Sequence, residues 1–210
     1  MESLVVYFQK GGSVMWGLLI LALIGLVIII ERIYSLFIVA RTNPLKLVEK
    51  VINIIEEEGL KEALEFLYNH KSPVAKVLAA GLEKIHGGRA LFEESMARKA
   101  ASELAFLDRG MIYLNAIAAV APILGFLGTV TGMIRAFDAI ALAGEVEPTL
   151  VAAGISEALI TTATGLIIAA PIAIFYAIFA DRINTYQRQI EEASNALMEY
   201  LLEKGILREA

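Results

Sequence analysis

Three long runs without a charged residue constrain the fold of this chain more than any other feature. The runs cover residues 11–30, 111–134 and 158–180. Each approaches or exceeds the ~20 residues that a helix needs to cross the hydrocarbon core of a bilayer. Because a membrane-spanning segment must satisfy its own backbone hydrogen bonds, helix is the expected state of all three. The sequence therefore predicts an all-α membrane protein with three transmembrane helices.

The first run is open to a second interpretation, a cleaved signal peptide. Its apolar stretch is longer than the ~7–15 residues of a signal core, and no clear cleavage site of small residues follows it. Glu31 and Arg32 end the run instead, and apolar residues continue as far as Phe37. The pattern favours a retained transmembrane helix.

Composition excludes several classes of function. A net charge of −5 gives no basic face for nucleic acid. The absence of cysteine excludes thiolate catalysis and cysteine metal sites. His70 and His86 lie in polar stretches without a ligand pattern, and a solvated surface position is the favoured interpretation of both. We therefore expect no metal, no cofactor and no catalytic site.

The distribution of lysine and arginine predicts the topology, because these residues gather in cytoplasmic segments. Eleven of them lie within residues 41–109, four follow Asp181, and none lies between Asp138 and Asp181. The N-terminus and the connection between the second and third spans are therefore expected outside, and the C-terminus in the cytoplasm.

This topology divides the chain into six segments. The second and third spans are expected to continue as helices into a cytoplasmic helical domain, one from about Arg89 to about Ala141 and the other through Asp181 to about Lys204. The expected segments are an external N-terminus with the first transmembrane helix (1–40), a cytoplasmic helical segment (41–110), the second transmembrane helix (111–141), a short external connection (142–153), the third transmembrane helix (154–180) and a cytoplasmic C-terminal helix (181–210).

Glu157, at the head of the third span, is a candidate functional residue, since ionisable groups at the edge of hydrocarbon are costly and often serve an ion path. At about 100° per residue, Thr161 and Thr164 share its helix face, and Thr162 points about 140° away. A helix-start carboxylate, favoured by the helix dipole, is the alternative for Glu157.

The second span carries small and polar residues as well. Gly128 and Gly132 have GxxxG spacing, which suits close helix packing. Thr129 is open to two interpretations, a bond to its own backbone or a pore-lining hydroxyl. Arg135 and Asp138 are three residues apart and are a possible pair at the mouth of a pore.

No carboxylate lies in the middle third of any span. A channel whose carrier must titrate at that depth would need the group from another subunit. The sequence therefore indicates a partner.

Two stretches resemble a known family. Residues 121–137, APILGFLGTVTGMIRAF, resemble the second membrane helix of the MotA/TolQ/ExbB proton-channel family, and residues 154–171, GISEALITTATGLIIAAP, resemble its third. Residues 8–15, FQKGGSVM, are more similar to the ExbB branch than to TolQ, and least to MotA, which has four spans. Arg135 departs from the family pattern, where this position is often uncharged.

The resemblance implies roles for three residues. Thr129 and Thr162 match the threonines that line the pore, and Glu157 matches the family's glutamate. Because the motif selects Thr162 rather than Thr161 or Thr164, Glu157 and the pore threonines are expected to face different surfaces.

The resemblance also implies partners and a setting. The family forms a pentameric ring in the bacterial inner membrane around a dimer of a single-span partner, ExbD or TolR, whose membrane aspartate titrates. Proton-motive force then moves the partner and passes energy to TonB and outer-membrane transport, or to TolA in the TolQ case. A non-conducting scaffold ring is a further alternative. An enzyme is not expected, because no catalytic constellation and no ATP-binding loop is present.

Overall fold

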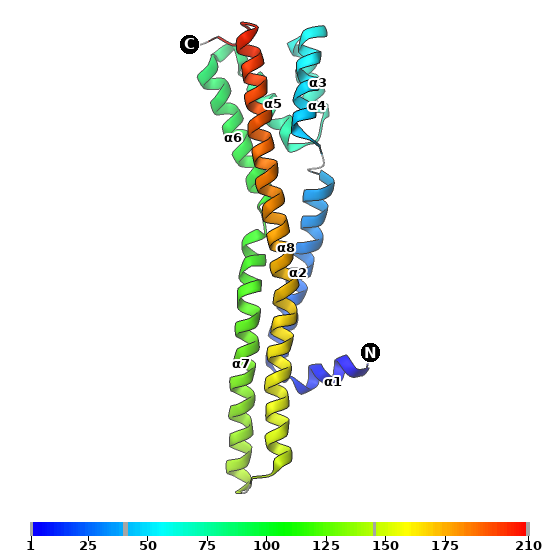
Figure 1. Cartoon of the computed structure of the whole chain (residues 1–210), viewed down its shortest axis with the longest axis vertical. Coiled ribbons are helices and arrows are strands. Elements are labelled where there is room, and N and C mark those ends of the chain that lie inside the picture. The colour runs from blue at the N-terminus through cyan, green and yellow to red at the C-terminus, as the bar shows by residue number, and fades with distance from the viewer. Residues whose placement is uncertain (1, 40–41, 145, 209–210) are drawn as a thin grey trace. The chain divides into compact units, whose positions relative to one another are not determined.

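The computed structural model describes residues 2–39, 42–144 and 146–208, and their regular structure is helical throughout (Figure 1). The helices are α1 (Glu2–Lys10), α2 (Val14–Tyr34), the π-helical turn η1 (Ser35–Val39), α3 (Pro44–Glu57), α4 (Leu60–Asn69), α5 (Pro73–Leu82), the 3-10 turn η2 (Ile85–Gly87), α6 (Arg89–Leu107), α7 (Met111–Ala143) and α8 (Pro148–Glu203).

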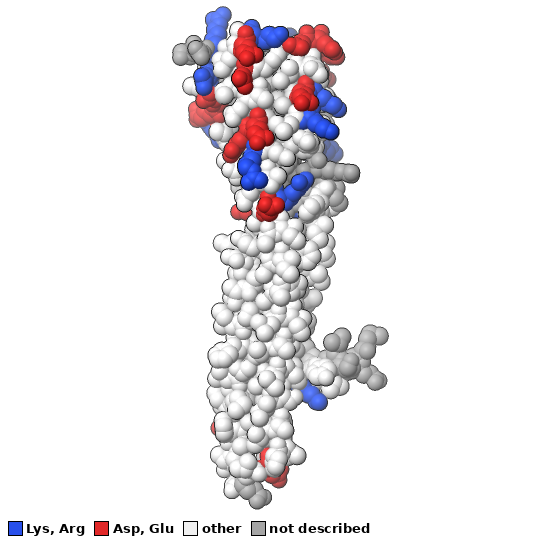
Figure 2. All heavy atoms as spheres, in the orientation of Figure 1, with Lys and Arg blue, Asp and Glu red and all other residues white. Residues whose placement is uncertain are grey.

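The chain forms two compact units. Unit 1 combines the N-terminal residues through Ile30 with Gly110–Ile178, and unit 2 combines Glu31–Arg109 with Phe179–Ala210. Unit 1 thus holds the three apolar runs almost whole. Figure 2 shows the difference in surface chemistry, because charged side chains crowd the visible face of unit 2 and are sparse on that of unit 1.

Among the described residues, three helical segments are long and apolar enough to cross a membrane, as the sequence predicts: Val14–Phe37, Arg89–Ala143 and Pro148–Glu203. Many of their large apolar side chains are exposed on the isolated chain. Ile112 is 73% exposed, Ile123 64% and Phe126 65%. Such a surface suits lipid or other protein rather than water.

The long helix expected from Arg89 to Ala141 is wrong in one respect, since the structure divides it into α6 and α7. Gly110 separates them in the left-handed conformation, with a φ of 88°, which a residue with a side chain rarely adopts. The residues before Asp108 are strong helix formers, so the sequence predicts a helix that continues through this position. Glycine here acts as a terminator, not as a tolerated helix interior.

α8 is continuous and ends as predicted. Proline occupies its first position, where the missing amide hydrogen costs no helical bond. After Glu203, the amides of Gly205 and Ile206 return to the carbonyls of Leu202 and Leu201. The connection between α7 and α8 covers only residues 144–147, of which 145 lies outside the described residues, and is shorter than the expected 142–153.

Unit 2 is a helical bundle with well-defined helix starts. The Asn43 side chain accepts hydrogen bonds from the amides of Leu45 and Lys46 at the start of α3. Ser72 Oγ accepts one from Ala75 at the start of α5. Apolar side chains fill the interior, including Val51, Leu67, Leu78, Phe92, Leu197 and Leu201.

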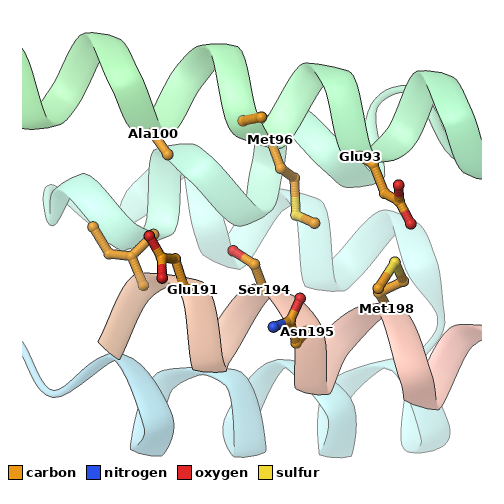
Figure 3. Close-up of a pocket in the computed structure, with 9 residues that line it drawn as sticks. Glu93, Met96, Ala100, Glu191, Ser194, Asn195 and Met198 are labelled. Carbon is orange, nitrogen blue, oxygen red and sulfur yellow. The ribbon is translucent and has the colours of Figure 1, made fainter. Parts of the chain in front are cut away.

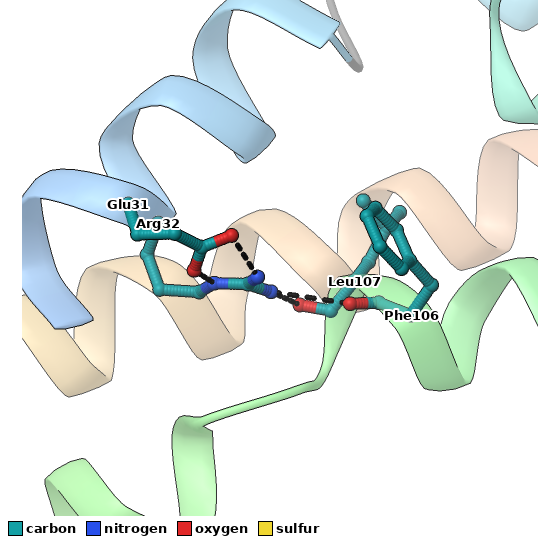
Figure 4. Close-up of polar contacts among 4 residues, drawn as sticks. All are labelled: Glu31, Arg32, Phe106 and Leu107. Carbon is teal, nitrogen blue, oxygen red and sulfur yellow. Dashed lines mark hydrogen bonds and ion pairs between the residues drawn. The ribbon is translucent and has the colours of Figure 1, made fainter.

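Arg32 is buried inside unit 2, with 1% of its surface exposed. Its guanidinium pairs with Glu31 and donates to the carbonyls of Leu107 at 2.6 Å and Phe106 at 3.2 Å (Figure 4). These carbonyls belong to the last turn of α6, where a cation also complements the helix dipole. Arg32 thus caps α6 just before the break at Gly110.

Candidate functional site

Small residues form a close contact between α7 and α8, which we call the α7–α8 seam. A Cβ added to Gly125 would lie 3.0 Å from the carbonyl oxygen of Thr161, and one on Gly132 would lie 3.1 Å from that of Gly154. The backbones approach this closely because side chains are absent. The seam residues are Ala121, Gly125, Gly128, Gly132 and Ala136 on α7, and Gly154, Ala158, Thr161 and Gly165 on α8.

Thr161 is sealed inside the seam. Its side chain has no exposed surface, and it fills the space where Gly128 lacks one. Its hydroxyl donates to the Ala158 carbonyl at 2.9 Å, the usual way for a threonine to satisfy itself in a membrane helix. Thr161 therefore packs the two helices together and has no surface to offer a water-filled path.

Thr162 lies beside the seam and reaches α7. Its hydroxyl lies 3.2 Å from the Gly125 carbonyl and 3.2 Å from the Ala158 carbonyl. In a regular helix the Gly125 carbonyl is also the acceptor for the amide of Thr129. The structure thus brings Thr129 and Thr162, the two threonines selected by the motif, to one side of the seam.

Thr129 is partly exposed on this side of the hairpin. Its hydroxyl donates to the Phe126 carbonyl at 2.6 Å, so the side chain turns back onto its own helix. A hydroxyl oxygen bound in this way keeps lone pairs free to accept from water or from another side chain. The two threonines form what we call the threonine side of the hairpin.

The opposite side of the hairpin receives α2. Gly25 of α2 allows the Ile172 side chain of α8 to approach, and Gly17 lies near Leu124 of α7. Met15 and Leu18 pack in a buried cluster with residues of both helices, among them Ile160. We call this surface the α2 side.

Glu157 lies on the α2 side and pairs with Arg135 of α7. The distance from Glu157 Oε1 to Arg135 Nη1 is 2.8 Å, and the Glu157 side chain is 15% exposed. Within the described residues, this pair takes the place of the expected partnership between Arg135 and Asp138. The two residues belong to different helices, and the antiparallel packing of α7 and α8 brings them together.

Gly12, in the turn between α1 and α2, lies directly against this ion pair. A Cβ there would overlap Glu157 Oε1 and lie 3.1 Å from Arg135 Nη1. Sequence reasoning did not select Gly12, although the Gly11-Gly12 pair signals a tight turn. A groove of about 640 Å³ opens nearby, with Lys10, Arg135, Ser156 and Glu157 in its lining.

The structure thus separates the predicted site residues. Thr129 and Thr162 lie on the threonine side, while Glu157 and Arg135 lie on the α2 side. That Glu157 and the pore threonines face different surfaces of the assembled channel stays a prediction. Residues 158–180 of α8 and 111–134 of α7 contribute no aspartate or glutamate to either side.

A second groove, of about 450 Å³, lies in unit 2 between α6 and α8 (Figure 3). Met96 and Met198 contribute to its lining, with Glu93 and Glu191 at its edge. Glu93 pairs with Arg89 at 2.7 Å, and Glu191 accepts a hydrogen bond from Gln187. Both carboxylates are thus engaged along their own helices, and the groove brings together no set of groups suited to chemistry.

Comparison with known proteins gives one consistent result. Residues 69–192 match the model of the MotA/TolQ/ExbB proton channel family. An ExbB homolog of Methanothermobacter thermautotrophicus is 30% identical over 184 residues, which cover 88% of this chain and 65% of that protein. An ExbB-like biopolymer transport protein of Synechocystis is 35% identical over 167 residues, covering 77% and 65%.

The Tol-Pal system protein TolQ of Haemophilus influenzae is 37% identical over 86 residues, which cover 41% of this chain and 38% of that protein. The chain spans about two thirds of the length of the two ExbB-type relatives. The family match covers more than half of the chain and includes all of α7 and α8 as far as residue 192. The chain belongs to the MotA/TolQ/ExbB proton channel family.

Proposed function

We propose that the chain is a proton-channel subunit that uses proton-motive force to drive a TonB-type envelope complex from the inner membrane. Five copies form a ring, and their threonine sides face a central path. The observation that supports this role is the hydrogen bond from the Thr162 hydroxyl to the carbonyl of Gly125, one turn before Thr129, on the side of the hairpin away from α2.

The titrating group of this path comes from a partner. The apolar runs of α7 and α8 hold hydroxyls but no carboxylate, so they can orient water and accept hydrogen bonds without binding a proton themselves. An ExbD-like or TolR-like protein with one membrane span supplies an aspartate between the threonines. The N-terminus lies in the periplasm and the C-terminus in the cytoplasm, in keeping with the lysine and arginine distribution.

Thr161 and Thr162 are adjacent in sequence but lie in different surroundings, which makes a direct test possible. Thr162→Val and Thr129→Val remove hydroxyls from the threonine side with little change in shape. We expect each to reduce proton flux at least tenfold in liposomes that contain the complex with its partner, measured with a pH-sensitive dye. Thr161→Val is the matched control, because its side chain is sealed in the seam, and its flux should stay within about twofold of wild type.

Two outcomes would contradict the proposal. Equal loss of flux in the Thr161 and Thr162 variants would mean that hairpin packing, not the threonine side, controls the path. A complex that assembles with its partner but conducts no protons would favour a non-conducting scaffold ring.

The similarity to a TolQ protein favours a second candidate, a subunit that serves envelope integrity. The two differ in the protein that receives the energy. Co-purification with a TonB-like protein supports the first candidate, and co-purification with a TolA-like protein supports the second.

A further inference from the structure

The Arg135–Glu157 pair joins three separate segments of unit 1. Arg135 belongs to α7, Glu157 to α8, and the turn that covers the pair contributes Gly12. A Cβ added to the neighbouring Gly11 would lie 3.2 Å from the side chain of Ile160, about one turn further along α8. The pair therefore lies where the start of α2 meets the end of the α7–α8 hairpin.

Burial makes this pair more than a surface contact. The Glu157 side chain is 15% exposed, and its enclosed Oε1 atom has no hydrogen-bond partner among the described residues, so charge attraction to Arg135 is what engages it. Enclosing a polar oxygen away from water is costly unless a partner of complementary charge lies beside it. The Arg135 guanidinium lies 2.8 Å away and is half exposed on the isolated chain.

We propose that Arg135 is a positioning residue, whose guanidinium holds the Glu157 carboxylate against Gly12 and so fastens the α1–α2 turn to the hairpin. The inference rests on the proposed function in one respect, that a fastened hairpin presents Thr129 and Thr162 in fixed positions to the proton path. Glu157 itself then acts as a structural anchor on the α2 side and does not carry the proton.

The contact between the α1–α2 turn and the ion pair requires glycine at position 12. Its φ of +70° is unfavourable for any residue with a side chain, and a Cβ would displace the carboxylate that Arg135 holds. Gly144 provides a contrast, because its φ is +75° but nothing lies within 4 Å of an added Cβ. The two glycines share a backbone conformation and differ in their contact with the ion pair.

The absence of cysteine from the chain makes distance measurements straightforward. Cysteines introduced at the exposed positions Gln9, on α1, and Ala141, on α7, would carry spin labels in the full ring with its partner. We expect a narrow distance distribution for otherwise wild-type protein and a broad one for Arg135→Gln. Arg135→Lys should restore the narrow distribution, and so should the exchange Arg135→Glu with Glu157→Arg.

Proton flux is the second readout. Arg135→Gln should lower the flux severalfold, and the lysine variant and the charge exchange should recover at least half of it. Gly12→Ala should broaden the distribution as Arg135→Gln does, while Gly144→Ala should leave it narrow. If Arg135 contributed only packing and no charge, the exchange Arg135→Glu with Glu157→Arg would not restore the narrow distribution or the proton flux.

The two readouts separate failure of this inference from failure of the proposed function. An unchanged distance distribution in Arg135→Gln would overturn the positioning role, whatever the flux. A broadened distribution in a complex that conducts no protons even as wild type would support the positioning role and overturn the proposed channel function.

Discussion

At the scale of single residues, helical spacing predicts faces but not the neighbours of those faces. Helical spacing places Thr161 and Thr164 on the same face of α8 as Glu157. Spacing does not predict which part of that face packs against α7, and in the structure Thr161 is buried in the α7–α8 seam, away from solvent. Likewise, a spacing of three residues favours a pair of Arg135 with Asp138, whereas in the structure Arg135 pairs with Glu157 of the neighbouring helix.

Glu103 gives a prediction of pH dependence in unit 2. It is nearly buried and binds Lys76 at 2.9 Å and Lys99 at 3.0 Å. Burial alone would raise the pKa of Glu103, but the hydrogen bonds and charges of the two lysines outweigh it and lower the pKa from its ordinary 4.5. Since the folded pKa is depressed, the stabilisation is complete above about pH 4.5 and is lost as the pH falls through the lowered value.

We expect Glu103→Gln to lower the free energy of unfolding by about 1–3 kcal/mol at neutral pH, because it removes charge-assisted hydrogen bonds. The measurement is thermal unfolding in detergent between pH 7 and pH 3. The difference between wild type and variant should stay constant down to about pH 4.5 and then shrink. A difference that grows in acid would contradict the assignment.

At the scale of elements, replacing a glycine by alanine should have different effects in the α7–α8 seam and in the contact between α2 and the hairpin. A methyl group on Gly128 would overlap the Thr161 side chain, whereas one on Gly17 would meet Leu124 Cδ1 at 3.7 Å, an ordinary contact. We therefore expect Gly128→Ala to destabilise the chain by about 1–3 kcal/mol through overpacking. Gly17→Ala should be neutral or stabilising by up to about 1 kcal/mol, since alanine favours helix.

Thermal midpoints of the two alanine variants in one detergent would check this pair. Equal midpoints would show that the seam relaxes around an added methyl group. Loss at Gly17 alone would mean that α2, not the seam, limits the packing of the hairpin.

The elements themselves were largely predictable, because three uncharged runs of sufficient length leave helix as the only solution in a bilayer. The end of α8 followed from Gly205. The break between α6 and α7 did not, since the residues up to Leu107 favour helix and Gly110 is a single interruption. Contacts across helices, such as Gly12 on Glu157, depend on tertiary register that spacing does not contain.

At the scale of the whole molecule, unit 1 exposes many large apolar side chains on the isolated chain, a surface that suits lipid or other protein chains. Lipid would cover part of this surface in a membrane, and the proposed ring of copies would cover another part. Native mass spectrometry of the purified complex is expected to give five copies of this chain. A different count would argue against the ring that the family resemblance implies.

The break at Gly110 has a mechanical consequence. A continuous helix resists twisting, because each turn is bonded to the next through its ladder of hydrogen bonds. α8 extends unbroken from Pro148 to Glu203 and belongs to both units. The path through α6 and α7 is interrupted at residues 108–110, where backbone torsion can be absorbed. If the proposed motor turns or tilts its membrane helices, we expect the backbone of residues 108–110 to take up the twist between α6 and α7, while the hydrogen-bond ladder of α8 stays continuous.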